Sequence, residues 1–120
     1  WRIVILFAII IEGIANQQHD FFLKEKQMSL LELESDLNEF TQPHELIAIN
    51  SGDYPTPMYF THRKGWILHN EDLKEERKLK ELREKGLRCV VILNDNPVVL
   101  SHFSFLRLVR KNSHYSIYQF

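Results

Sequence analysis

The chain has 120 residues, enough for one domain with a hydrophobic core that needs no disulfide or metal to support it. Its composition, 44% hydrophobic and 26% charged, is that of a globular protein and argues against disorder or a fibrous repeat. The 15 basic and 16 acidic residues interleave, so no nucleic acid is expected as a partner. The single cysteine, Cys89, excludes an internal disulfide, and its apolar neighbours favour a buried small side chain over a nucleophile.

An apolar run from Ile3 to Ile11 opens the chain, with neither the period of a strand nor that of an amphipathic helix. It is too short to cross a bilayer, which requires about 20 apolar residues. Because the first residue is Trp1 rather than Met, we expect a piece of a longer protein, in which the run is the end of a truncated membrane helix. A buried strand or core helix is the alternative. A helix starting here is expected to reach as far as Lys26.

The rest of the chain alternates between expected helices and strands. Helices are expected at residues 29–41, 58–62, 71–85 and 97–110, and strands at 45–50, 65–69, 88–93 and 115–120. This alternation predicts an α/β fold, a three-layer αβα sandwich around a small, mostly parallel, four-stranded Rossmann-like sheet, preceded by an N-terminal helix. The expected division is a tether at 1–26 and a soluble α/β domain at 27–120.

Polar loops follow three of the expected strands, at residues 50–53, 69–71 and 94–96. In a parallel sheet such loops meet at the carboxyl edge, where ligands bind. Neither a dinucleotide fingerprint nor a P-loop pattern is present, so nucleotide binding by a standard route is not predicted. Asp53, Glu71 and Asp95 are either carboxylates that bind a cation or act as acid and base, or ordinary turn and cap residues.

The most unusual local cluster is His62, Arg63 and Lys64 with Trp66. Three potential cations beside an indole suit contact with a phosphate or stacking on a sugar. A solvated turn before a strand, with Trp66 packed in the core, explains the same residues. Together with Asp53, these four are the candidate ligand or phosphate contacts. No catalytic residue, metal ligand or cofactor is predicted.

Residues 50–66 carry a family resemblance. The stretch, which reads NSGDYPTPMYFTHRKGW, resembles a segment of bacterial membrane glycosyltransferases related to the dolichyl-phosphate-mannose protein mannosyltransferases and the lipid A aminoarabinose transferases. Such enzymes have many membrane helices and often end in a soluble α/β domain outside the cytoplasmic membrane. They transfer a sugar from a polyprenyl-phosphate donor to protein or lipid. Their catalytic acidic residues lie near the first membrane helices, in a part that this chain does not contain.

The resemblance therefore implies a non-catalytic domain that is inactive alone, on the periplasmic side of a bacterial cytoplasmic membrane. Its implied partners are the membrane-embedded part of the same protein and a polyprenyl-phosphate sugar or acceptor. The alternative is a self-contained α/β module that binds a small ligand or ion beside Asp53 and Asp95. Away from a membrane, Ile3–Ile11 is expected to bury against the domain or to drive self-association.

Overall fold

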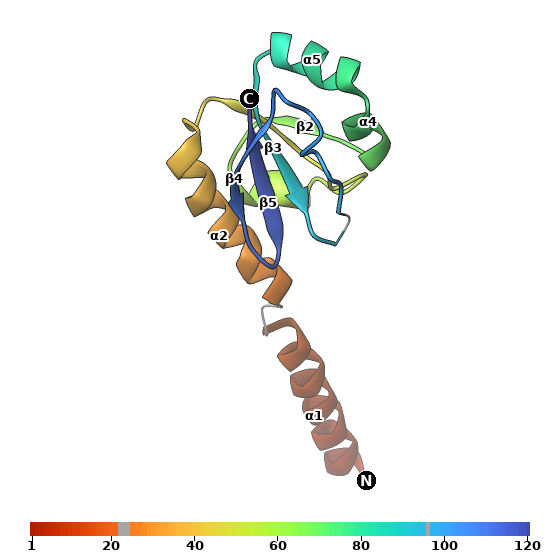
Figure 1. Ribbon diagram of the computed structural model, residues 1–120. Helices are drawn as coiled ribbons and strands as arrows, with labels where there is room; N and C mark the ends of the chain where they lie inside the picture. Colours follow the sequence, from red (N-terminus) through yellow and green to blue (C-terminus); the bar gives the residue numbers. More distant parts are fainter. Residues whose placement is uncertain (22–24, 96) are drawn as a thin grey trace.

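A computed structural model describes residues 1–21, 25–95 and 97–120, which form an N-terminal helix and an α/β body (Figure 1). Helix α1 spans Arg2–Phe21 and extends away from the body. The apolar run is therefore helical, and the alternative of a buried strand is wrong. The expected continuation to Lys26 crosses residues 22–24, which lie outside the described part. None of the described helices combines the length and the apolarity that crossing a membrane requires.

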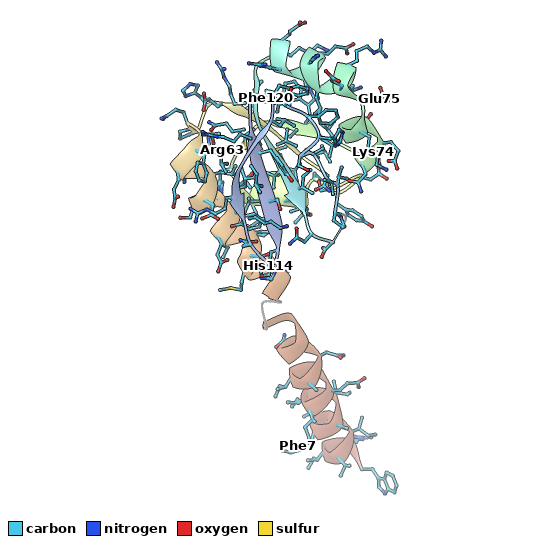
Figure 2. All side chains as sticks on the ribbon, viewed as in Figure 1. Phe7, Arg63, Lys74, Glu75, His114 and Phe120 are labelled. Atoms are coloured by element: carbon cyan, nitrogen blue, oxygen red, sulfur yellow. The ribbon has the colours of Figure 1, made fainter. Side chains whose placement is uncertain are left out.

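The apolar side chains of α1 are exposed on every side of the helix. Their exposed fractions run from 48% at Ile10 to 71% at Ile3, and Figure 2 shows Phe7 pointing away from the helix axis. A helix that is apolar all round is normally buried in a core or a bilayer. The expected burial of Ile3–Ile11 against the domain is therefore not observed.

The body is built on a mixed sheet of five strands in the order β2-β1-β3-β5-β4. The strands are β1 (Leu46–Ile49), β2 (Gly65–Ile67), β3 (Leu87–Leu93), β4 (Arg107–Lys111) and β5 (Tyr115–Gln119). Strand β1 pairs in parallel with β2 and β3, whereas β5 pairs antiparallel with β3 and β4. The prediction of a four-stranded, mostly parallel Rossmann-like sheet is therefore wrong in strand number and direction. The coarser prediction, an α/β fold, is confirmed.

Most of the difference between the predicted and the observed sheet lies in residues 97–110, where a helix was expected and is not observed. Residues 97–106 form irregular turns, and Val98, Leu100, Phe103 and Leu106 are buried against one face of the sheet. Strand β4 follows and returns to β5 through a short turn at Asn112, whose Oδ1 accepts from the backbone N–H groups of His114 and Tyr115, both at 2.8 Å. A turn this short forces neighbouring strands to run antiparallel.

Helices cover both faces of the sheet. Helix α2 (Glu25–Phe40) and the short α3 (Thr56–Phe60) lie on one face, where Leu33, Leu37 and Ile49 belong to one buried cluster. The other face is covered by α4 (Asn70–Lys74), α5 (Glu76–Glu84) and the 97–106 turns.

The single helix expected at 71–85 is interrupted at Glu75, whose backbone is extended with ψ 104°. Leu73 and Leu79 are both completely buried. Residues six positions apart are rotated by about 120° in a continuous helix, so one straight helix cannot aim both leucines at the sheet. The break re-aims α5, and Glu75 lies on the outer side of the junction (Figure 2).

Gly65 begins β2 where two backbones come unusually close. It pairs with Ile47 of β1, and its φ of +150° lies outside the range that L side chains normally adopt. A Cβ atom built at this position would lie 1.7 Å from the Ile47 carbonyl oxygen. Only glycine fits here without moving β1.

Candidate functional site

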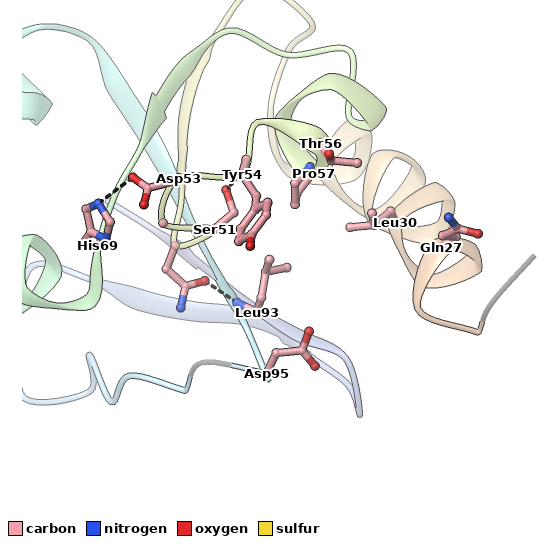
Figure 3. Close-up of a pocket in the computed structure, with 12 residues that line it drawn as sticks. Gln27, Leu30, Ser51, Asp53, Tyr54, Thr56, Pro57, His69, Leu93 and Asp95 are labelled. Atoms are coloured by element: carbon pink, nitrogen blue, oxygen red, sulfur yellow. Dashed lines mark hydrogen bonds and ion pairs between the residues drawn. The ribbon is translucent and has the colours of Figure 1, made fainter.

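A pocket of about 590 Å³ opens at the carboxyl edge of the parallel strands (Figure 3). Its lining includes Asn50 after β1, His69 after β2 and Asp95 after β3. The sequence predicted that these three loops meet, and they do, although Asn96 lies outside the described residues. The pocket is called the edge pocket below. Its lining residues are Gln27, Leu30, Asn50, Ser51, Gly52, Asp53, Tyr54, Thr56, Pro57, His69, Leu93 and Asp95.

Asn50 holds the three loops together. Its side chain is almost fully buried, at 1% exposure. Its Oδ1 accepts from the Leu93 backbone N–H at 2.6 Å, and its Nδ2 donates to Asn70 Oδ1 at 3.1 Å. One amide thus joins the ends of β1 and β3 to the start of α4. Both hydrogen bonds are partly shielded from water, where losing a partner is costly. The positions of the three loops therefore depend on Asn50.

A tight turn after β1 presents Tyr54. The Tyr54 backbone N–H donates to the Ser51 carbonyl at 3.1 Å, and Ser51 Oγ donates back to the Tyr54 carbonyl at 2.6 Å. Gly52 has a left-handed φ of +61°, and a Cβ there would lie 3.6 Å from the His69 ring. The tyrosine side chain is 73% exposed, and its ring lies between Ser51 and Pro57 in Figure 3.

Two different surfaces line the edge pocket. Leu30 of α2, Pro57 of α3 and Leu93 of β3 supply an apolar wall. The opposite rim carries carboxylate, hydroxyl and imidazole groups. This mixture of an apolar wall and a few polar groups is typical of pockets that bind small organic molecules.

The two carboxylates of the edge pocket stand apart. Asp53 Oδ1 lies 3.4 Å from His69 Nε2, and both side chains are largely exposed, so this pair contributes little to stability. Asp95 lies on another side of the Tyr54 ring (Figure 3). Glu71, the third acid that was expected to gather here, is not among the lining residues. Within the described ranges, no three His, Cys, Asp or Glu side chains are arranged to hold a metal ion.

The cluster of His62, Arg63, Lys64 and Trp66 lies at the opposite edge of the sheet. These residues precede β2 or lie within it, whereas Asp53 follows β1. Because β1 and β2 are parallel, the start of one strand and the end of the other lie at opposite edges. The five residues predicted as ligand or phosphate contacts are therefore not brought together in one place.

Arg63 is a structural residue in this fold. Its side chain is only 6% exposed and lies beside the end of α2 (Figure 2). The guanidinium donates to the Gln42 carbonyl, to the Thr41 carbonyl at 3.2 Å and to Asn38 Oδ1 at 2.7 Å. These carbonyls follow directly after the last turn of α2, where the helix dipole is negative and a cation is favourable.

The other members of the cluster diverge. His62 has a left-handed φ of 49°, and its Nδ1 lies 2.9 Å from Glu34 Oε1 on α2. The Lys64 carbonyl accepts from the Ile47 backbone N–H at 3.0 Å, and its side chain is exposed. Trp66 is half-buried and packs against the buried hydrophobic residues beneath α4 and α5. The alternative that Trp66 belongs to the core therefore describes the fold.

Cys89 lies in the centre of β3 and is completely buried. Burial raises the pKa of its thiol to about 12, because the thiolate would lose its hydration. A thiol in this state is inert, in agreement with the prediction of a small hydrophobic side chain.

Asn50, Tyr54 and His69 line the edge pocket, and none of them was among the candidate contacts predicted from the sequence, although Asn50 and His69 lie in loops that were expected to meet. The available signal was that Asn50 and His69 follow closely after β1 and β2. The prediction gave more weight to the cluster of His62, Arg63 and Lys64. Comparison with known proteins adds no assignment: no family model matches the chain, and neither a curated protein nor a solved structure matches it.

Proposed function

We propose that the chain is the non-catalytic, extracytoplasmic domain of an integral membrane glycosyltransferase, and that α1 is the end of one of its membrane helices. The complete enzyme would be mannosyltransferase-like and would transfer a sugar from a polyprenyl-phosphate donor to protein or lipid. It would reside in a bacterial cytoplasmic membrane, with this domain on the periplasmic side. The domain would assist acceptor recognition or cover the active site of the membrane-embedded part.

The observation that carries this proposal is the exposed apolar half of α1. Side chains from Ile3 to Ile11 are about half exposed or more in every direction around the helix, while Asn16 and Gln17 follow on the same helix. At about 1.5 Å per residue, the apolar part is about 14 Å long, roughly half the hydrocarbon thickness. A helix that is apolar at one end and polar at the other is typical of a segment that leaves a bilayer.

The arrangement of the body supports a role close to the membrane. Helix α2 begins at Glu25, only a few residues after α1 ends, and Gln27 and Leu30 of its first turns line the edge pocket. The edge pocket therefore lies on the side of the body where the tether enters. A domain built this way would present the edge pocket toward a membrane-embedded active site.

Vesicle flotation tests the tether. We expect the 120-residue chain to float with phosphatidylcholine vesicles, and a variant carrying Ile5→Glu and Ile10→Glu to stay in solution, because each buried charge costs several kcal/mol in hydrocarbon. The matched control carries the same two charges on exposed body positions, Tyr59→Glu and Val99→Glu, which are 76% and 69% exposed. Failure of the unmodified chain to float, or equal loss by the control variant, would contradict the proposal.

A self-contained binding module is the alternative, and the edge pocket is the observation that favours it. In that case α1 pairs with α1 of a second copy, and analytical sedimentation shows a dimer. The variant with Ile5→Glu and Ile10→Glu is then a monomer, and neither form binds vesicles.

The non-catalytic assignment has a separate test. Transfer of a sugar from a polyprenyl-phosphate donor by this chain alone would disprove it.

A further inference from the structure

We propose that the edge pocket binds a neutral sugar residue, with Tyr54 as the stacking surface and Asp53, Asp95 and His69 as hydrogen-bonding partners of its hydroxyl groups. The assignment of that sugar to an acceptor or donor glycan rests on the proposed function. The binding itself does not, because it depends only on the described pocket.

The apolar side of the edge pocket suits the C–H face of a pyranose ring. Tyr54 is 73% exposed, and the turn that carries it is fixed by two backbone-centred hydrogen bonds to Ser51. Pro57 and Leu93 lie next to its ring (Figure 3). An aromatic face is electron-rich and attracts weakly positive hydrogens, so an exposed ring on a fixed turn is an effective platform for a sugar.

The polar side of the edge pocket suits hydroxyl groups. Asp53 and Asp95 supply carboxylate oxygens that accept hydrogen bonds from O–H donors. His69 and Thr56 supply groups that both donate and accept, which matches the dual character of a sugar hydroxyl. These groups are distributed around the rim rather than focused on one point, so they fit a ligand with several spaced polar atoms.

Charge argues against the two main rival ligands. Among the lining residues that the structure describes, none is Lys or Arg and two are aspartates, so a phosphate would meet net negative charge from them. A metal ion would require converging ligands, yet Asp53 and Asp95 lie on different sides of Tyr54. The described chain also has no three-residue group suited to a metal. A neutral, polyhydroxylated ligand avoids both difficulties.

The size of the edge pocket fits this class. Its volume of about 590 Å³ lies within the usual range for small-molecule sites, about 300–1,000 Å³. Gln27 and Leu30 of the first turns of α2 line the edge pocket, so a larger lipid-linked or protein-linked glycan that extends past them would reach the side of the tether.

Chemical-shift mapping by NMR on the full 120-residue chain tests the inference, in detergent if α1 requires it. The probes are mannose, galactose, N-acetylglucosamine and arabinose, with mannose 6-phosphate and inorganic phosphate as anionic comparisons. We expect at least one neutral sugar to shift the backbone signals of Gly52, Tyr54 and His69 at millimolar concentration. Mannose 6-phosphate should bind more weakly than mannose, and phosphate should not bind in the edge pocket.

Tyr54→Ala should weaken the affinity about tenfold, which is typical for truncation of a central aromatic contact. The matched control is Tyr59→Ala, because Tyr59 is 76% exposed on neighbouring α3 and does not line the edge pocket. Asp95→Asn should weaken binding without altering the spectrum elsewhere.

Absence of any shift with the neutral sugars, tighter binding of the phosphorylated sugar, or equal loss in both tyrosine variants would overturn the inference. Sugar binding with failed flotation would reject the tether while the site survives. Flotation without sugar binding would do the reverse.

Discussion

Replacement of Arg63 by Met distinguishes a structural residue from a ligand contact. Met keeps the apolar stem of the side chain but removes the donors to Asn38, Thr41 and Gln42. A hydrogen bond to a charged group contributes about 1.5–3 kcal/mol net, and water can partly replace the guanidinium at exposed Gln42. We therefore expect the free energy of unfolding to fall by about 3 kcal/mol.

Urea unfolding followed by circular dichroism measures this loss. With a slope of about 1.5 kcal/mol per molar urea, the midpoint should fall by about 2 M at unchanged slope. The matched control is Lys64→Met, which removes a neighbouring exposed cation and should change stability by less than about 0.5 kcal/mol. Equal midpoints for the two variants, or a loss of phosphate affinity in Arg63→Met at full stability, would refute the structural assignment.

Three further changes test other parts of the fold. Gly65→Ala should destabilise the body by about 3 kcal/mol or more in urea unfolding, because the new Cβ meets the Ile47 carbonyl, whereas Gly13→Ala meets nothing within 4 Å and should be neutral or stabilising. Asn50→Ala should cost about 2 kcal/mol and weaken sugar binding, since the Leu93 N–H loses its acceptor; unchanged binding would contradict its role in positioning the loops. The Cys89 pKa is raised from 9.0 to about 12 on folding, so between about pH 9 and pH 12 mainly the unfolded chain loses this proton. Stability should fall in this window by up to about 1.4 kcal/mol per pH unit, a slope that Cys89→Ala should reduce in alkaline urea titrations.

The elements that the sequence predicted well are those with strong local signals. Strands β1 and β3 are short, mainly apolar runs followed by turn formers, and each of their observed bounds lies within one residue of the expected one. Gly86, with φ of +102°, follows the C-cap residue Lys85 of α5, at the position where a glycine typically ends a helix. Local propensity and turn chemistry decide these features, so one sequence is enough to find them.

The elements that were not predicted from the sequence depend on contacts with residues distant in the chain. Residues 97–106 are apolar because they cover the sheet, and burial of an irregular segment leaves no periodic pattern that separates it from a helix. The pairing of β5 with β3 joins two segments that are far apart in the sequence, and no local motif predicts it. Arg63 looked like a ligand contact because its acceptors at the end of α2 lie more than twenty positions earlier in sequence.

The position of β5 has a consequence for the order in which the body assembles. Strand β5 comes last in the chain, yet it lies between β3 and β4, and in the described sheet β4 pairs only with β5. During synthesis α1 and the first three strands leave the ribosome well before β5 does. A chain stalled or cleaved before Tyr115 would keep the exposed apolar helix α1 while lacking the strand that joins β4 to the rest of the sheet, and such a species would be prone to misassembly and proteolysis.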